Sequence, residues 1–574
     1  MKRLAALKCA LAAVTALGLA GCAGRGEEAA FPDLARTVFG DYLAGRYAER
    51  IGDDRISAAY FARALSQSPE ETILRESAFI SALEAGDMEP AAEFARQTLE
   101  NDPSDRLARI TLAVSAIADR DYDAALARLE GAELGPFNRV IGALLRAWAH
   151  AGKGDQEAAF AALAFASTAD EQAFGDLADA HKALLLDYFG DEDAAEAAFE
   201  AVAGRGLVSG SAAEAHGRLL ERQGRTEDAI AVYQTQIDRV GRNILLEAAI
   251  ERARAGREKP KPFIRRPGDG AAEALFGPAA ALAAQRQREL AIIYLRLALT
   301  ARPDHAPALA LLAALYERSG RTEAAVTLYD AVDPRSPTYV GAQIDRAWAL
   351  WRDDQETVAL ASARALARET DDPRARSTLA DMLRAQGLFE EAVEVLDGLI
   401  ADLDDAVEWS HFFARGAARE RLGRWDGPEG AQADLERALE LSPDQPDVLN
   451  YLGYSWVDRG ERLDEGFELI KRAVELRPNS GYIVDSLGWA YYRLGDYDTA
   501  VEHLERAVEL DPQDPTLNDH LGDAYWQVGR RLEARFQWRR ALSLEPEAEE
   551  IPVLQAKVQV GLSGTTPPGG DAEP

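Results

Sequence analysis

A period of about 34 residues near the C-terminal end constrains the fold of this chain more than any other feature. Three columns of residues recur with that spacing. They are Pro478, Pro512 and Pro546 (34 and 34 apart), Gly453, Gly488 and Gly522 (35 and 34), and Gly466, Ala500 and Ala534 (34 and 34). A period shared by three columns predicts a stack of repeated units, none of which can bury its apolar faces alone.

Each column has a mechanical role in a pair of antiparallel helices. Small residues such as Gly488 and Ala500 let the two helices approach closely, and Tyr491 fills the layer between neighbouring pairs. We therefore predict that the repeat is built on Leu452, Gly453, Gly466, Pro478, Leu487, Gly488, Tyr491, Ala500, Ala507, Pro512, Leu521, Gly522, Tyr525, Ala534 and Pro546.

The helix ends of the repeat can also be predicted. Gly495 is expected to end a first helix in a left-handed cap, and Asp496 to cap the second helix that follows. Pro512 stops the second helix, and Asp514 with Pro515 supplies an N-cap and a proline at the first helical position of the next unit.

These residues resemble the tetratricopeptide pattern, for example in Leu487-Gly488-x-x-Tyr491 followed by Ala500, Ala507 and Pro512. The aromatic residue that opens the pattern is absent, since Val484 stands in its place. The resemblance implies an all-α fold, a superhelical solenoid of antiparallel helical hairpins with roughly eleven to thirteen repeats. The Ala-rich composition favours helices as well.

The pattern drifts towards the N-terminus and is interrupted once. Residues 257–270 are rich in basic residues, with three prolines and two glycines, and we expect a linker there. The linker would separate a degenerate N-terminal solenoid (34–256) from a C-terminal one (271–562), and residues 563–574 read as a disordered tail. The linker is either a solvated loop or a basic docking strip for an acidic partner.

The first 33 residues are typical of a targeting signal followed by a membrane anchor. Lys2 and Arg3 precede a short apolar run, which ends in Leu19-Ala20-Gly21-Cys22. This resembles the lipobox of bacterial lipoproteins, and the resemblance implies removal of residues 1–21 and lipidation of Cys22. Two or more acyl chains, palmitate among them, would anchor the chain stably. Residues 22–33 would form the lipidated tether. Ala23 favours the outer membrane, facing the periplasm, and the alternative is an ordinary secretory signal.

Charge and motifs bear on the chemistry. The formal net charge of −33 disfavours nucleic-acid binding, because phosphates would be repelled. The seven histidines are never closer than 17 residues (His503 and His520), so no zinc-protease signature exists. Walker A, G-x-S-x-G and G-x-G-x-x-G motifs are absent too. We expect no enzyme activity, no metal and no cofactor beyond the covalent lipid on Cys22.

The first helix of each hairpin lines the concave surface in such solenoids. Counting from the Leu-Gly column places aromatic, amide and carboxylate side chains there, and this stripe suits an extended peptide or a partner helix. The candidate protein-binding residues are Asn450, Tyr454, Asp485, Trp489, Tyr492, Asp519, Asp523 and Trp526. The alternative is that Trp489 and Tyr492 only pack between repeats. Because the stripe is acidic or aromatic, we expect a neutral or basic peptide ligand.

The residues from Leu449 to Leu476 are similar to those of envelope lipoproteins that act as adaptors. Those adaptors bind a periplasmic C-terminal processing protease and present cell-wall hydrolases to it. The likeness implies a membrane-anchored protein-binding scaffold with these classes of partner. An alternative is an assembly or export-machinery lipoprotein, such as a pilotin or a secretion scaffold.

Overall fold

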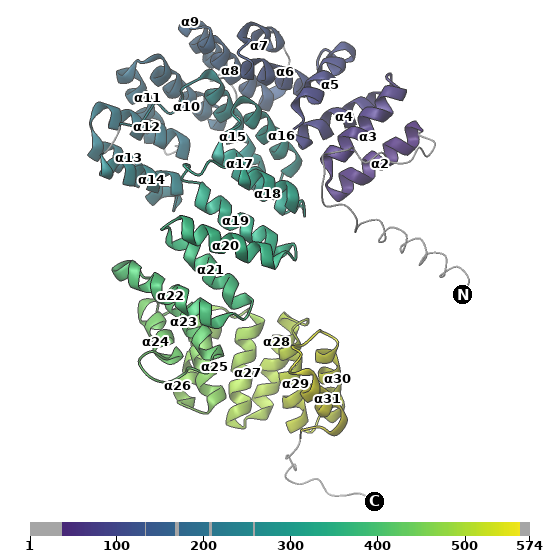
Figure 1. The fold of residues 1–574 in the computed structure, drawn as a ribbon, viewed down its shortest axis with the longest axis vertical. Coiled ribbons are helices and arrows are strands. Elements are labelled where there is room, and N and C mark those ends of the chain that lie inside the picture. The colour runs from purple at the N-terminus through teal and green to yellow at the C-terminus, as the bar shows by residue number, and fades with distance from the viewer. Residues whose placement is uncertain (1–36, 132–133, 167–171, 206–208, 257–258, 563–574) are drawn as a thin grey trace, which may run out of the picture. The chain divides into compact units, whose positions relative to one another are not determined.

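The computed structural model describes residues 37–131, 134–166, 172–205, 209–256 and 259–562, and these residues form α-helices joined by short turns (Figure 1). Consecutive helices pair into fourteen antiparallel hairpins in the described residues, and α14 and α31 have no second helix of their own. The all-α hairpin architecture predicted from the sequence is confirmed, and the hairpin count is close to the expected eleven to thirteen. The leader, Cys22, the tether and the tail lie outside the described residues.

Contacts divide the chain into two units. Unit 1 holds the described residues of Met1–Val208 and Lys261–Pro303. Its helices are α2 (Val38–Ile51), α3 (Asp54–Gln67), α4 (Thr72–Ala85), α5 (Met88–Asn101), α6 (Arg106–Ala118), α7 (Tyr122–Leu129), α8 (Gly135–Gly152), α9 (Gln156–Ala166), α10 (Gln172–Phe189), α11 (Glu192–Gly204), α15 (Pro267–Ala284) and α16 (Arg288–Ala301).

Unit 2 holds the described residues of Ser209–Pro260 and Asp304–Pro574. Its helices are α12 (Gly210–Gln223), α13 (Thr226–Val240), α14 (Ile244–Ala255), α17 (Ala306–Glu317), α18 (Thr322–Asp330), α19 (Tyr339–Arg352), α20 (Glu356–Glu369), α21 (Pro373–Ala385), α22 (Phe389–Leu403), the 3-10 turn η1 (Asp404–Ala406), α23 (Trp409–Arg421), α24 (Ala431–Leu441), α25 (Pro446–Arg459), α26 (Leu463–Leu476), α27 (Gly481–Leu494), α28 (Tyr497–Leu510), α29 (Pro515–Gln527), α30 (Arg531–Leu542) and α31 (Ile551–Val560).

The hairpin α27–α28 shows how the sequence sets each helix end. Gly495 follows α27 with a φ of 83°, the left-handed region that favours glycine. The Asp496 side chain accepts a hydrogen bond from the Thr499 backbone N–H at 3.3 Å and caps α28. Asp514 accepts from the N–H of Thr516 at 2.8 Å and caps α29 in the same way. These predicted caps are confirmed.

The small residues of the repeat lie where paired helices touch. A Cβ on Gly488 would lie 2.6 Å from Leu504 Cγ, and one on Gly522 would lie 2.5 Å from Trp538 Cδ1. A Cβ on Gly453 would lie 2.7 Å from the backbone oxygen of Gly466. Any larger residue would therefore force each pair of helices apart.

The hairpin α15–α16 covers the first-helix side of unit 1. Its main contacts are with α4, α6, α8 and α10, which are the first helices of their hairpins (Figure 1). Gly270 lies against Trp148, since an added Cβ would be 2.2 Å from the indole Cε2. Arg296 Nε also donates to the Glu84 carbonyl at 3.1 Å. The first-helix side of these hairpins is thus covered by a later part of the same chain.

The predicted linker and domain boundaries differ from this arrangement. Helix α15 begins at Pro267, inside the segment 257–270, and Asp269 accepts from the backbone N–H groups of Arg265 and Arg266 at 3.0 Å each. Pro267 therefore opens a helix, at the first position that tolerates proline. The hairpin α15–α16 groups with unit 1 and α12–α14 with unit 2.

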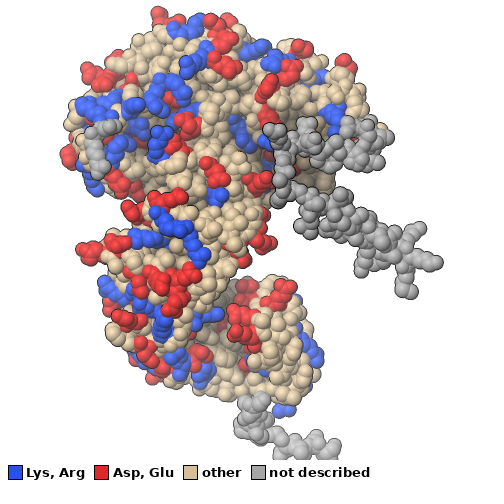
Figure 2. Space-filling view, viewed as in Figure 1, with Lys and Arg blue, Asp and Glu red and all other residues tan. Residues whose placement is uncertain are grey.

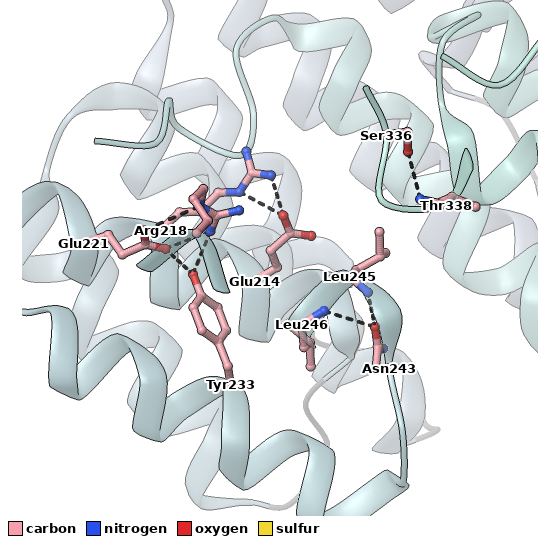
Figure 3. Close-up of polar contacts among 10 residues, drawn as sticks. Glu214, Arg218, Glu221, Tyr233, Asn243, Leu245, Leu246, Ser336 and Thr338 are labelled. Atoms are coloured by element: carbon pink, nitrogen blue, oxygen red, sulfur yellow. Dashed lines mark hydrogen bonds and ion pairs between the residues drawn. The ribbon is translucent and has the colours of Figure 1, made fainter. Parts of the chain in front are cut away.

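Helix α14 is held to α12–α13 by a buried polar cluster. The Tyr233 hydroxyl donates to Glu221 Oε1 at 2.7 Å (Figure 3). Arg252 of α14 donates to the same oxygen at 2.7 Å. Burial and this carboxylate raise the pKa of Tyr233. Asn243 caps α14 by accepting from the N–H of Leu245 at 3.0 Å. A helix without its own partner is thereby fixed by charge-assisted hydrogen bonds.

Candidate functional site

The first helices of successive hairpins in unit 2 lie side by side, and we call the surface that they form the groove of unit 2. Helices α19, α21 and α23 contact one another in turn, as do α25, α27 and α29. Helix α31 follows the last hairpin in the position of a further first helix, because Lys557 comes 34 residues after Asp523. The predicted stripe lies on α25, α27 and α29.

None of the eight predicted stripe residues is fully exposed. Asn450, Asp485 and Asp523 are buried. The other five are partly exposed, namely Tyr454, Trp489, Tyr492, Asp519 and Trp526. These residues lie on the first helices α25, α27 and α29, where Trp489 stacks on Tyr492 and where Asp519 and Asp523 share the ammonium group of Lys557.

Aromatic rings stack between neighbouring repeats on the α27–α29 part of the wall. Trp489 stacks on Tyr492 with ring centroids 4.7 Å apart, and on His520 of α29 at 4.1 Å. His520 Nδ1 lies 2.9 Å from Asp485 Oδ2. Although burial lowers the pKa of His520, the charge and hydrogen bond of Asp485 outweigh it and hold that pKa above its ordinary value.

Lys557 of α31 neutralises the acidic end of the stripe. Its Nζ donates to Asp519 Oδ2 at 2.7 Å and to Asp523 Oδ2 at 2.9 Å. The other Asp523 oxygen accepts from Trp538 Nε1 at 2.9 Å. Burial and the Asp519 charge still raise the pKa of Asp523 to about 6, against the opposing effect of Lys557. These two predicted carboxylates are therefore already paired within the chain.

Part of the stripe has no internal partner. Asn450 Oδ1, Asp485 Oδ1 and Trp489 Nε1 are buried and make no hydrogen bond in the described part of the chain. Buried polar atoms are normally paired, so such atoms call for a bound group.

Two cavities open upstream of the stripe in unit 2. One of about 480 Å³ is lined from α19, α21 and α23 and includes Asp345, Arg374 and His411. The other, of about 520 Å³, is lined from α21 to α25 and includes Arg384 and Tyr451. Asp381 lines both, so the two cavities adjoin along the groove.

The carboxylates of these cavities are accessible but lie among protein atoms. The Asp381 side chain is 51% exposed, yet burial raises its pKa against the effect of Arg384. Burial also raises the pKa of Asp345, which makes no hydrogen bond or ion pair in the described residues. Arg374 is neutralised by Asp372 through bonds of 2.6 and 3.0 Å. Figure 2 shows acidic and basic side chains interspersed over the face that it draws.

Sequence analysis missed these cavity residues, although the repeat contains a signal for them. In a later repeat, Ala500 follows Gly488 by a fixed number of residues. The same spacing, counted back from Ala392, places Ser377, Asp381 and Arg384 at the groove positions of α21. Among the residues described, no group of three or more His, Cys, Asp or Glu side chains could hold a metal ion. No described helix is both long and apolar enough to cross a bilayer.

Comparisons with known proteins identify the repeat. Family models described as tetratricopeptide repeats match residues 181–239, 308–332 and 413–481, and one described as a TPR repeat matches 488–529. A TPR repeat-containing protein of Pseudomonas aeruginosa is 42% identical over 64 residues, 11% of either chain. Human tetratricopeptide repeat protein 13 is 28% identical over 138 residues, 24% of this chain and 16% of that protein. The alignments thus span less than a fifth of either relative.

Solved structures of similar helical proteins were also found. A tetratricopeptide repeat protein from Parabacteroides merdae is 16% identical with a TM-score of 0.37, covering 43% of this chain and 96% of its own. The Cut9–Hcn1 hetero-tetramer of APC/C is 14% identical with a TM-score of 0.38, and the match covers 92% of this chain and 97% of that one. Yeast Tom70 is 13% identical with a TM-score of 0.35, and the match covers 91% of this chain and 95% of that one. The scores are below 0.5, so the repeat assignment rests on the family models and the hairpins.

Proposed function

The chain is a tetratricopeptide-repeat protein, and we propose that it is a scaffold that binds partner proteins in the groove of unit 2. Tetratricopeptide-repeat proteins generally bind other proteins, and the fold fits that role. The observation that carries the proposal is the pair of adjoining cavities along α19 to α25. The corresponding surface of unit 1 is occupied by α15–α16, which leaves unit 2 as the recognition surface.

The chemistry of the groove supports a neutral or basic segment as the ligand. Three of the four arginines that line the cavities already contact an acid: Arg242 contacts Glu247, Arg374 contacts Asp372, and Arg384 contacts Asp381. An incoming carboxylate would compete with these internal acids, whereas Asp345 makes no ion pair in the described residues.

We further propose that the scaffold works in the cell envelope, anchored by lipid on Cys22 in the outer membrane. Its sharpest form is an adaptor that brings cell-wall hydrolases to a periplasmic C-terminal processing protease. If the membrane form co-purifies with export or assembly components and with no protease or hydrolase, the adaptor form is wrong. Loss of membrane association and of acyl labelling in Cys22→Ala is the result expected for the anchor, and full retention of both would contradict it.

The groove is tested by photo-crosslinking in cells with the full-length chain. A photoreactive residue at Ser377 or Ser410, which line the 480 Å³ cavity, should trap partner proteins. The control is Lys471 on the second helix α26, where the side chain is 52% exposed. Equal capture from all three positions would show that the groove is not the binding surface.

A further inference from the structure

Two groove residues on neighbouring first helices carry acceptor oxygens without partners. Asn450 is 7% exposed and Asp485 is 5% exposed, and one side-chain oxygen of each makes no hydrogen bond in the residues that the structure covers. They occupy equivalent positions of successive repeats, 35 residues apart on α25 and α27. An unpaired buried acceptor is costly, and more so when it belongs to a carboxylate.

Aromatic rings flank these oxygens. Tyr454 and Trp489 follow Asn450 and Asp485 by four residues, so each ring lies on the same helix face as its acceptor. Burial raises the pKa of Tyr454, and the charges of Asp458 and Asp485 add to that effect. The α25–α27 site, defined as Asn450, Tyr454, Asp485 and Trp489, thus combines two unpaired acceptor oxygens with the unpaired Nε1 donor of Trp489 and the phenol of Tyr454.

The next repeat shows which chemical group satisfies these positions. Asp519 stands at the position of Asp485 and Asp523 at that of Trp489, each 34 residues later. Both carboxylates accept from one ammonium group, that of Lys557 in α31, at 2.7 and 2.9 Å. The chain itself therefore fills the C-terminal end of the stripe with a cation.

We propose that the α25–α27 site binds a lysine or arginine side chain of a partner segment, a proposal that rests on the groove of unit 2 being the binding surface. The cation donates to Asn450 Oδ1 and Asp485 Oδ1, the two buried acceptors that have no partner of their own. The unpaired Trp489 Nε1 donates to a main-chain carbonyl of the same segment.

An anionic ligand does not fit the site. Asp485 shares its second oxygen with His520, and Arg493, whose charge acts on Tyr454, is paired with Asp458 at 3.0 Å. No described cation donates a hydrogen bond to the two oxygens. The two buried acceptors, one of them a carboxylate oxygen, therefore select a donor of positive charge.

Peptide selection on the full-length protein tests this inference. A random 12-residue peptide library displayed on phage is selected on the wild-type protein, and the recovered peptides are resynthesised with each basic residue replaced by norleucine. Affinities are measured for the wild type, Asp485→Asn and Asp458→Asn. We expect recovered peptides to carry a lysine or arginine whose replacement weakens wild-type binding about tenfold, the size of one charge-assisted hydrogen bond.

The double-mutant cycle decides between a direct contact and general attraction. In Asp485→Asn the norleucine replacement should have little further effect, while Asp458→Asn should behave as the wild type does. Asn450→Asp should tighten binding of the basic peptides, a gain that misfolding cannot produce. The inference is overturned if no basic peptide is recovered or if Asp458→Asn weakens binding as much as Asp485→Asn. Crosslinks from Ser377 and Ser410 would still establish the groove in either case.

Discussion

The imidazole of His520 lies flat against the indole of Trp489, with ring centroids 4.1 Å apart and an interplanar angle of 17°. The two residues come from consecutive first helices, α29 and α27. Asp485 meets the edge of the same imidazole at 2.9 Å. The contact between these repeats therefore contains a charge that depends on pH.

The first prediction concerns the protonation of this histidine. Because Asp485 raises the pKa of His520, hydrogen–deuterium exchange at the imidazole carbon, followed by mass spectrometry, should give a value above the 6.5 of a free histidine. When the pKa of a histidine is higher in the folded state than in the unfolded state, protonation of that histidine stabilises the fold. This contribution is fully present below the pKa of the unfolded state. That contribution is lost as pH rises through the folded value. His520→Gln should therefore destabilise α27–α29 more at pH 6 than at pH 8.5.

His503 is the matched control, since it also stacks on an aromatic ring. Its centroid lies 5.2 Å from that of Tyr491, and burial lowers its pKa. The sign is then reversed: the contribution of His503 is present above pH 6.5 and is lost as pH falls through its folded value. Equal pKa values for the two histidines would contradict the ion pair with Asp485.

The local part of this fold could be predicted from the sequence. Gly488, Gly495 and Pro515 each impose one steric requirement, and such requirements act within a single hairpin. The packing of α15–α16 on α4, α6 and α8 joins segments far apart in the chain, and Ala-rich faces carry little information about which helix they will meet. Pro267 was compatible with both a linker and a helix start, and only burial against unit 1 decides between them.

The candidate site was predictable only in part, for a similar reason. The repeat spacing found the stripe on α25 to α29, but it could not say that Lys557 would neutralise Asp519 and Asp523. That lysine lies beyond the last full repeat, although its distance of 34 residues from Asp523 is itself a signal. The cavities around Asp381 were not predicted, because the repeat pattern is weaker in that part of the sequence.

The second prediction tests the close approach within a hairpin. Gly488→Ala places a methyl group 2.6 Å from Leu504 Cγ and should destabilise α27–α28 by about 1–3 kcal/mol, as overpacking does. Gly398→Ala in α22 is the control, because nothing lies within 4 Å of its Cβ position. There alanine should stabilise the helix by up to about 1 kcal/mol. Backbone hydrogen exchange of each hairpin is the measurement, and equal responses would refute the packing argument.

The third prediction concerns the ammonium group that closes the stripe. Lys557→Met leaves Asp519 and Asp523 side by side, and it should loosen α31 by about 3 kcal/mol at pH 7.5, the low end for a buried pair that has lost one partner, because Asp519 is partly exposed. Removing the cation raises the pKa of Asp523 further above 6. A carboxyl with a raised folded-state pKa destabilises the fold as pH rises through that value, so the defect should shrink towards pH 5.

Hydrogen exchange of residues 551–560 measures this effect. Lys471→Met is the control, since Lys471 and Glu468 form an exposed pair at 3.8 Å whose loss should have little effect. If the defect in Lys557→Met is independent of pH, the packing of the Lys557 side chain holds α31 in place, and its charge does not.

The last prediction tests whether α15–α16 is a fixed part of unit 1. Gly270→Val would drive a side chain into the Trp148 indole, because the Cβ position is 2.2 Å from Cε2, and α15 should separate from α8. Trp148 Nε1 donates to His181 Nδ1 at 3.0 Å, and burial lowers the pKa of His181 to about 4. Hydration of the opened surface should raise that value towards 6.5. Imidazole exchange at His181 measures the shift, with Gly277→Ala as a control whose nearest neighbour lies 3.9 Å away. An unchanged His181 in Gly270→Val would show that α15 adjusts in place and keeps the first-helix face of unit 1 covered.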